Sequence, residues 1–270
     1  MKIVALVVLL VAIVVGAWFV LRPKPEPVLP PPPVVVKPDP QIKVIGTSVQ
    51  GRALQSFTFG HGSTTLAFVG GIHGGYEWNS VELAQQFIAY LKTNPSAVPA
   101  NLTVTVIPNA NPDGFALGKE ASARFNANKV DLNRNFDCEW QAEATWRGEQ
   151  VSAGTAAFSE PEARALRDFF LAVKPSAVIF WHSQANTVYA SKCAGNVLPE
   201  TKTIMNTYAT AAGYGTAETF DAYAVTGAAE DWLASINIPA ITVELKTHET
   251  VEWEQNLAGI KALMGYYSLN

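Results

Sequence analysis

The stretch that decides the fold reads Thr65-Leu66-Ala67-Phe68-Val69-Gly70-Gly71-Ile72-His73-Gly74-Gly75-Tyr76-Glu77-Trp78-Asn79-Ser80. It opens with a continuous apolar run of strand length, which a pair of glycines ends. From Ser80 to Leu91 the apolar residues return at helical spacing. The stretch therefore predicts a strand, a loop and a helix, with His73 and Glu77 on the loop.

His73 and Glu77 are a candidate metal pair. Imidazole nitrogen and carboxylate oxygen are common ligands of a zinc ion used for hydrolysis, which takes a third protein ligand and keeps one position open for water. The alternative is a turn histidine beside a helix-start carboxylate that the helix dipole favours. The pair alone does not choose between these interpretations.

On either side of this stretch, further apolar strands are predicted to alternate with amphipathic helices. Short alternating stretches at 42–45 and 50–60 predict edge strands with turns at Gly46 and Gly60. Three later strands are expected at 102–108, 177–181 and 239–245, and helices from Ser159 to about Val173, at 198–212 and at 252–267. Ser159-Glu160-Pro161-Glu162 fits a capping box at the first of these helices. The pattern predicts an α/β fold with a mixed, largely parallel central sheet and helices on both faces.

The N-terminal region has a different composition from the rest. Ile3 to Leu21 is an uninterrupted apolar run, close to the roughly twenty residues that cross a bilayer as a helix. It ends in Trp18, Phe19 and Arg22, which favours a transmembrane signal anchor over residues 1–22, with a cleaved signal peptide as the alternative. Residues 23–40 are half proline and predict a linker. A membrane-anchored protein with an extracytoplasmic domain at 41–270 is expected.

Composition and charge exclude one class of partner. The formal net charge is −4, and no Lys/Arg-rich stripe occurs in the 270 residues. The electrostatic footprint of a nucleic-acid-binding protein is therefore missing. Cys138 and Cys193 can form one disulfide, which is expected only if the domain faces an oxidising compartment; two free thiols are the alternative.

Several polar residues fall at or near predicted strand ends, where sites form in α/β folds. His182 follows the strand at 177–181 and is the best third metal ligand, although it could be a core histidine bonded to the backbone. Glu244 ends another strand, where a carboxylate facing a metal-bound water would act as a general base. Arg134 is a fixed cation flanked by amides, which suits a bidentate grip on a carboxylate.

Together these stretches resemble the zinc carboxypeptidase family across roughly residues 41–270. Four segments carry the resemblance in the family's order: Gly71-Ile72-His73 with Glu77-Trp78; Asn111-Pro112-Asp113-Gly114 with Asp131-Leu132-Asn133-Arg134-Asn135-Phe136; His182-Ser183; and Thr242-Val243-Glu244-Leu245. The resemblance implies His73, Glu77 and His182 as ligands of one Zn²⁺ ion and Glu244 as the catalytic acid and base. It also implies Asn133 and Arg134 as the site that binds the terminal carboxylate of the substrate.

Three further roles follow from the resemblance. Arg124 would polarise the scissile carbonyl, Tyr223 would close over bound substrate, and Glu230 would select a basic terminal side chain. The alternatives are a surface arginine, a packed tyrosine and a solvated helix carboxylate. One departure from the family is the spacing, because Gly74-Gly75-Tyr76 places three residues where the family usually has two between the first His and the Glu. Two glycines can absorb an extra residue, so Glu77 is still expected to reach the metal.

The expected function is a zinc metallocarboxypeptidase that cleaves beside a free C-terminal carboxylate, with a basic or amine-bearing terminal residue and a peptide or muropeptide substrate. A peptidase for diaminopimelate-containing peptidoglycan peptides and a small-acyl-amino-acid deacylase are alternatives within the same superfamily. A non-catalytic, membrane-tethered module that binds peptide C-termini is an alternative of another class. Such a module should have lost Glu244 or a metal ligand, and all of them are present.

Overall fold

The computed structural model describes Trp18, residues 40–195 and residues 197–269. The predicted anchor at 1–22 and linker at 23–40 lie outside the described residues, except for Trp18 and Pro40. Within the described ranges, no helix is both long and apolar enough to cross a membrane.

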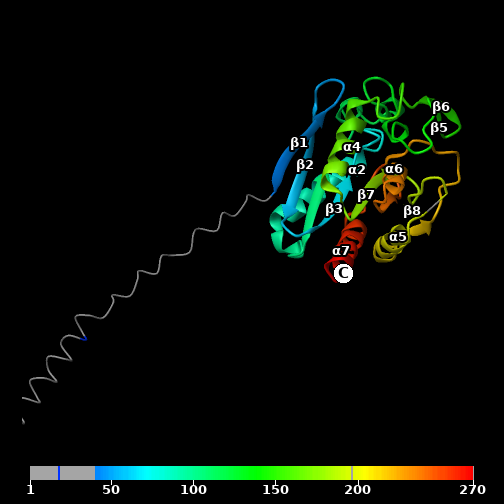
Figure 1. The fold of residues 1–270 in the computed structure, drawn as a ribbon. Coiled ribbons are helices and arrows are strands. Elements are labelled where there is room, and N and C mark those ends of the chain that lie inside the picture. The colour runs from blue at the N-terminus through cyan, green and yellow to red at the C-terminus, as the bar shows by residue number, and fades with distance from the viewer. Residues whose placement is uncertain (1–17, 19–39, 196, 270) are drawn as a thin grey trace, which may run out of the picture. The chain divides into compact units, whose positions relative to one another are not determined.

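The chain alternates strands and helices as expected (Figure 1). The strands are β1 (Gln41–Thr47), β2 (Ala53–Gly60), β3 (Thr64–Val69), β4 (Leu102–Ile107), β5 (Glu143–Trp146), β6 (Glu149–Ser152), β7 (Ala177–Ser183), β8 (Thr187–Ala190), β9 (Gly215–Ala217) and β10 (Ala240–Leu245). The α-helices are α2 (Trp78–Thr93), α3 (Pro112–Phe115), α4 (Pro161–Val173), α5 (Pro199–Ala212), α6 (Ala229–Ser235) and α7 (Trp253–Leu269). Short 3-10 turns are η1 (Pro95–Ala97), η2 (Ala121–Arg124) and η3 (Leu132–Arg134).

An eight-stranded sheet has the order β1-β2-β4-β3-β7-β10-β8-β9. Its central strands β4, β3, β7 and β10 are parallel, and β1, β2 and β8 add antiparallel pairs. The mixed, mostly parallel sheet of the sequence analysis is confirmed. β5 and β6 form a separate two-stranded hairpin.

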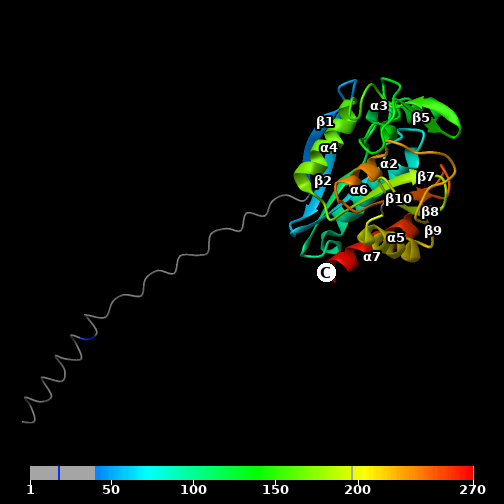
Figure 2. The same cartoon turned by 45° about the vertical axis from the view of Figure 1, so that its right-hand side comes forward.

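Helices cover both faces of this sheet because alternate strand residues point to opposite sides. On one face, Phe68, Trp181 and neighbouring apolar residues pack against α2, α5 and α7. On the other face, Val69 and Phe180 pack against α4 and α6. Figures 1 and 2 show α5 and α7 side by side.

Two details of the first strands differ from the sequence expectation. Gly46 is not a turn: it lies inside β1 at a register shift, and a Cβ on it would come 2.4 Å from Ala165 Cβ of α4. Glycine is therefore needed for close packing of α4 on this strand. β2 is not an edge strand, since it pairs with β1 and β4.

The predicted capping box of α4 is also wrong. The N-cap residue is Glu160, which makes no side-chain cap hydrogen bond. The Glu162 carboxylate instead accepts from the Val49 backbone N–H and from Asn126 Nδ2. Long-range partners have replaced the local ones that the capping pattern needs.

The topology brings the candidate site together. β3, β7 and β10 are parallel neighbours, so their carboxyl ends meet at one edge of the sheet. The loop with His73 follows β3, His182 lies near the end of β7, and Glu244 lies near the end of β10.

Candidate metal centre and active site

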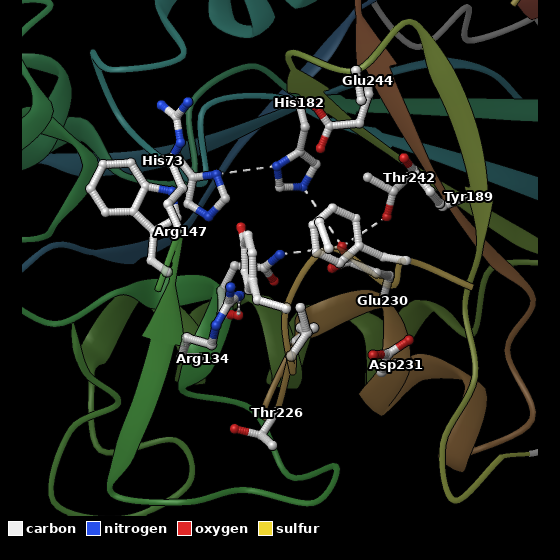
Figure 3. Close-up of a pocket in the computed structure, with 18 of the residues that line it drawn as sticks. His73, Arg134, Arg147, His182, Tyr189, Thr226, Glu230, Asp231, Thr242 and Glu244 are labelled. Carbon is white, nitrogen blue, oxygen red and sulfur yellow. Dashed lines mark hydrogen bonds and ion pairs between the residues drawn. The ribbon is translucent and has the colours of Figure 1, made fainter. Parts of the chain in front are cut away.

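His73, Glu77 and His182 converge on one point. His73 Nδ1 lies 2.8 Å from Glu77 Oε1, and His182 Nδ1 lies 3.1 Å from Glu77 Oε2. The two Nδ1 atoms are 3.2 Å apart (Figure 3). All three side chains are buried.

The donor set fits a single zinc ion. Tetrahedral coordination with zinc–nitrogen bonds of about 2.0–2.1 Å separates two nitrogen ligands by about 3.3 Å, which is close to the distance between the two Nδ1 atoms. Two imidazoles and one carboxylate are also the ligand types of catalytic zinc sites, where a fourth position is left to water or substrate. Within the described part of the chain, these are the only His, Cys, Asp and Glu residues grouped closely enough to hold a metal ion.

The loop between His73 and Glu77 accommodates its extra residue through its glycines. Gly74 has a φ of +50°, a conformation that side-chain-bearing residues rarely adopt. A Cβ on Gly75 would lie 1.8 Å from the Gly118 carbonyl oxygen. The two glycines press against the 114–123 segment, and Glu77 reaches the two histidines as predicted.

Carboxylates lie behind both histidine rings. Asp131 Oδ1 is 3.4 Å from His73 Nε2, and Glu230 Oε1 is 3.8 Å from His182 Nε2. Neither Nε2 atom has a hydrogen-bond partner among the described residues. The carboxylates therefore act on the rings through charge, in the arrangement that orients histidine ligands and raises their basicity in metal sites.

The triad has the electrostatics of a cation site. Burial alone would raise the pKa of Glu77, but attraction to His73 and His182 holds it far below its usual range. Burial alone would lower the pKa of His182, but Glu77 raises it to about 9. The buried carboxylate thus favours positive charge at the two rings, which a metal cation also supplies.

Glu244 stands beside the triad because of strand register. β10 pairs in parallel with β7 so that Glu244 lies opposite His182, and both residues line the same pocket. Burial, followed by repulsion from Glu77, raises the pKa of Glu244 to about 8. A carboxylate of raised pKa beside a metal site can accept and return a proton near neutral pH.

Arg124 is buried next to the triad and is not a surface arginine. Its Nε donates to Asp131 Oδ2 at 2.8 Å, and its Nη1 lies 3.5 Å from Glu77 Oε1. Its guanidinium also stacks over Trp146 at 4.6 Å from the ring centroid. Asp131 therefore holds Arg124 in place, while Arg124, followed by Arg134, keeps the pKa of that buried acid well below its usual range against the effect of burial.

A pocket of about 720 Å³ connects these residues with Asn133, Arg134 and Tyr223. Arg134 donates to the carbonyl oxygens of Thr145 and Asn133 through Nε, Nη1 and Nη2. A guanidinium carries five N–H groups, so one on each terminal nitrogen remains for a carboxylate. Asn133 accepts from the Ala229 N–H and donates to Glu230, which fixes the start of α6 against the pocket.

Glu230 is a buried carboxylate, and the alternative of a solvated helix residue is wrong. Its Oε1 accepts from Thr242 Oγ1 at 2.8 Å and from Asn133 Nδ2 at 3.2 Å. Its Oε2 is buried without a hydrogen-bond partner in the described structure. A buried, unpaired carboxylate oxygen is unfavourable, and Glu230 is one of the residues that line the pocket.

Tyr223 is half-buried at the pocket and packs on Phe220, with ring centroids 4.8 Å apart. Burial raises the pKa of its hydroxyl. It belongs to the loop between β9 and α6 that reaches Glu230. The structure thus brings all nine predicted site residues to one pocket.

Tyr76, Trp146, Arg147 and His248 are among the pocket residues that were not anticipated from the sequence. Tyr76 is the extra residue of the metal loop, so the unusual spacing was the available signal. Trp146 and Arg147 lie at the tip of the β5–β6 hairpin, where Arg147 and Gly148 both have positive φ. A two-residue turn of this kind usually carries Asn-Gly or Asp-Gly, so Arg147-Gly148 gave little signal.

Cys138 and Cys193 form a disulfide with a Cα–Cα distance of 5.9 Å. The bridge joins the segment after Arg134 to the segment after β8. Backbone hydrogen bonds from Phe136 N–H to Gly227 O and from Gly227 N–H to Cys138 O tie the same segment to the loop before α6. The bridge therefore braces the pocket wall that carries Asn133 and Arg134.

This fold and donor set define a mononuclear zinc site of the hydrolase type. The family model described as zinc carboxypeptidase matches residues 37–259. The chain therefore belongs to the zinc carboxypeptidase family, and His73, Glu77 and His182 form the zinc-binding triad typical of it.

Curated relatives include both carboxypeptidases and cell-wall peptidases. The chain is 25% identical over 239 residues to γ-D-glutamyl-L-diamino acid endopeptidase 1 of Lysinibacillus sphaericus, covering 74% of this chain and 59% of that protein. It is 29% identical over 151 residues to murein peptide amidase A of Escherichia coli K12, covering 52% and 56%. The chain thus spans little more than half the length of these relatives.

Solved structures establish the fold. The structure of thrombin-activatable fibrinolysis inhibitor matches with a TM-score of 0.71 at 19% identity, over 86% of this chain and 70% of that one. The murein-tripeptide amidase of Escherichia coli O157 matches with a TM-score of 0.61 at 24% identity, over 92% and 96%.

Proposed function

We propose that this protein is a zinc-dependent carboxypeptidase that hydrolyses the peptide bond next to a free C-terminal carboxylate, with a basic or amine-bearing terminal residue. The observation that carries the proposal is one pocket that holds the zinc triad and Glu244 together with Arg134 and the unpaired oxygen of Glu230. A metal centre and two charged recognition groups in one cavity suit a substrate with a carboxylate and an amine near its scissile bond.

The side chains divide the chemistry among them. A zinc ion held by the triad would supply a Lewis acid that polarises the scissile carbonyl and acidifies the attacking water. Glu244 takes the proton from that water and passes it to the leaving amine. Arg124 donates to the carbonyl oxygen as negative charge develops on it, since its Nη1 already lies beside the triad.

Substrate orientation rests on Arg134 and its neighbours. The two N–H groups of Arg134 that bond no carbonyl oxygen can bind the terminal carboxylate in a bidentate way. Asn133 belongs to the same carboxylate-binding site. Glu230 Oε2 receives the amine of the terminal side chain, which supplies the partner that this buried oxygen lacks. Tyr223 closes over the bound residue from the loop before α6.

The acid–base role is tested by Glu244→Gln. The variant should lose about 10²- to 10⁴-fold in kcat, because glutamine cannot take a proton from water. Its zinc content should stay at one ion per chain, measured by atomic absorption. A fully active Glu244→Gln enzyme would exclude this role.

The specificity role is tested by comparing peptides that end in Lys and in Phe. The zinc-loaded wild type should prefer Lys, and Glu230→Gln should bring the ratio of kcat/KM values toward one while zinc stays bound. An unchanged ratio rules the pocket role out.

A peptidoglycan peptide is the second candidate substrate. Two relatives are named for diamino acids and murein peptides, and diaminopimelate carries an amine that Glu230 could bind. Mass spectrometry can measure the release of diaminopimelate from muropeptides and the release of Lys from the Lys-ending peptides. Comparing the two rates separates the two candidate substrates. The presence of all three zinc ligands and of Glu244 disfavours a module that only binds peptides. Arg134 and Tyr223 in the pocket favour a peptide substrate over a small acyl-amino acid.

The location of the protein belongs to the same proposal. An anchor at 1–22 with the domain outside the cytoplasm is supported by the disulfide, because such bridges persist in oxidising compartments. Protease treatment of intact cells should degrade the domain. Resistance in intact cells, together with cleavage after lysis, would place the domain inside.

A further inference from the structure

The extra residue of the metal loop presents a side chain to the pocket. Gly74 and Gly75 pack against the 114–123 segment, so Tyr76 is the one residue between His73 and Glu77 that carries a side chain. Tyr76 lines the same pocket as the zinc ligands.

Tyr76 is held by residues from two other segments. Arg147 Nη1 donates to its hydroxyl at 3.2 Å. Its ring meets the Trp146 ring edge-on, with centroids 5.2 Å apart, and lies 4.7 Å from the ring of His248. We call these four residues, Tyr76, Trp146, Arg147 and His248, the aromatic wall.

The wall is anchored to the metal centre. His248 Nδ1 lies 2.7 Å from Ser183 Oγ, and Ser183 follows the zinc ligand His182. Ser183 Oγ donates to Asn79 Oδ1, so its lone pairs accept from His248. Asn79 of α2 in turn donates to the Thr247 and Thr250 carbonyls, which fixes the loop that carries His248.

The wall and Glu230 lie beside different ligands of the zinc triad. Glu230 lies behind His182, with its Oε1 3.8 Å from His182 Nε2, and Figure 3 shows it to the right of both histidines. The wall lies on the His73 side, because Tyr76 belongs to the loop between His73 and Glu77 and Trp146 stacks on Arg124. If the terminal side chain reaches Glu230 beside His182, the acyl part of the substrate, on the other side of the scissile carbonyl, lies toward His73 and the wall.

Arg147 gives this wall a positive charge without a protein counter-ion. It is exposed, and no acidic side chain among the described residues lies within ion-pair distance of it. Arg124, in contrast, is paired with Asp131, and Arg134 is bonded to carbonyl oxygens. The Tyr76 hydroxyl orients the Arg147 guanidinium and leaves its other N–H groups available for a carboxylate.

We infer that the aromatic wall is a subsite for the acyl part of the substrate and that Arg147 selects an acyl residue that carries a free carboxylate. This inference rests on the proposed function. An α-linked acidic residue and a γ-linked glutamyl residue both offer this chemistry. The aromatic rings cover the carbon chain of that residue, and Arg147 binds its carboxylate.

The test compares acetyl-Glu-Lys with acetyl-Gln-Lys, and γ-D-glutamyl-Lys with its α-amide, on the zinc-loaded enzyme. Each pair differs in the one carboxylate. Wild type should prefer the acid by about tenfold in kcat/KM in at least one pair, mostly through KM, and the preference should shrink as salt screens it. The pair that shows the preference identifies the linkage.

Variants assign the preference to the wall. Arg147→Gln should bring the acid-to-amide ratio close to one, and Tyr76→Phe should reduce it partly because the guanidinium loses its anchor. Arg164→Gln, a charge-matched change at an exposed position of α4, should keep the wild-type ratio.

Equal rates on acid and amide in both wild-type pairs, or an unchanged ratio in Arg147→Gln, would overturn the inference while hydrolysis itself upholds the proposed function. Failure of the zinc-loaded wild type to cleave any of the four peptides would overturn the proposed function and this subsite with it.

Discussion

The pKa of Asp231 is shifted by its position in the wall of the charged pocket. Asp231 follows Glu230 on α6 and accepts from the Lys192 backbone N–H at 2.9 Å. Burial, followed by repulsion from Glu230, raises the pKa of Asp231 to about 7. The folded protein therefore holds this proton at pH values where the unfolded chain, with a pKa near 3.9, has lost it.

The sign of the effect on stability follows from proton linkage. Between about pH 4 and pH 7 the folded state binds more protons at Asp231 than the unfolded state, so the free energy of unfolding falls as pH rises through this window. Asp231→Asn keeps an acceptor for Lys192 and removes the charge. The free energy of unfolding of this variant minus that of wild type should be about 2–4 kcal/mol larger at pH 8 than at pH 5. Urea unfolding of the zinc-loaded proteins at the two pH values measures it. Equal differences at the two pH values would contradict this account.

Gly75 is the residue on which the metal loop depends most directly. A side chain there would collide with the Gly118 carbonyl oxygen, as its Cβ would lie 1.8 Å away. Gly75→Ala should displace Glu77 and weaken zinc binding by about 10- to 100-fold, measured by competition with a chelator. Gly265→Ala in α7 is the control, since its Cβ would meet nothing within 4 Å; zinc affinity as tight in Gly75→Ala as in this control would show that the loop tolerates a side chain.

At the scale of elements, the disulfide links two segments that the sheet does not connect. The bridge closes a loop of 55 residues between the η3 region and the end of β8. In the chain-entropy view, a loop of this length stabilises the folded state by about 4 kcal/mol, and measured values are often lower. The same segment carries Arg134, so the bridge bears on both stability and binding.

The double variant Cys138→Ala with Cys193→Ala should lose about 2–4 kcal/mol of unfolding free energy in urea and should raise KM more than it lowers kcat, because the pocket wall loosens. Phosphine reduction of wild type should reproduce the loss and leave the double variant unchanged. A double variant as stable as wild type would show that Gly227 and its backbone hydrogen bonds hold the segment alone.

The sequence predicted elements well where local pattern and burial agree. β3, β7 and β10 read as apolar runs because they are buried on both faces, and α2, α5 and α7 kept their helical spacing. Contacts between residues that lie far apart in the sequence could not be predicted from local pattern. β8 inserts antiparallel beside β10, Gly46 makes room for α4, and Glu162 bonds Val49 instead of capping its own helix.

At the scale of the whole molecule, the zinc ion should be part of the stability of the fold, because its ligands come from the loop before α2 and from β7. Zinc at 100 to 1,000 times its dissociation constant stabilises the native state by about 2.7–4.1 kcal/mol. Chelation should then lower Tm by roughly 5–15 °C, measured by calorimetry.

Two variants separate the ligands from their neighbours in this experiment. His182→Ala should show no shift on chelation, because the triad is broken. Glu244→Gln should keep the full shift, because Glu244 is not a ligand. A zinc-dependent Tm in His182→Ala would mean that the ion binds elsewhere.

The candidate site could be predicted in large part because its residues lie at strand ends, and strand ends of a parallel sheet meet. That rule and ligand chemistry made His73, Glu77, His182 and Glu244 candidates, and the resemblance to the zinc carboxypeptidase family implied their roles. The aromatic wall needed the path of the β5–β6 hairpin and of the loop with His248. The buried state of Glu230 likewise depends on Asn133 and Thr242, which local pattern does not bring together.

The register between the parallel strands β10 and β7 fixes the position of Glu244 relative to the zinc ligand His182. Glu244 stands opposite His182 in the hydrogen-bond ladder. A slip of one residue would shift β10 by about 3.3 Å and turn the apolar side chain of Val243 or Leu245 toward the zinc edge. Metal affinity could survive such a slip, but the proton acceptor would be gone. In a refolding experiment, turnover would therefore count only molecules with the correct strand register, whereas circular dichroism would count misregistered ones as well.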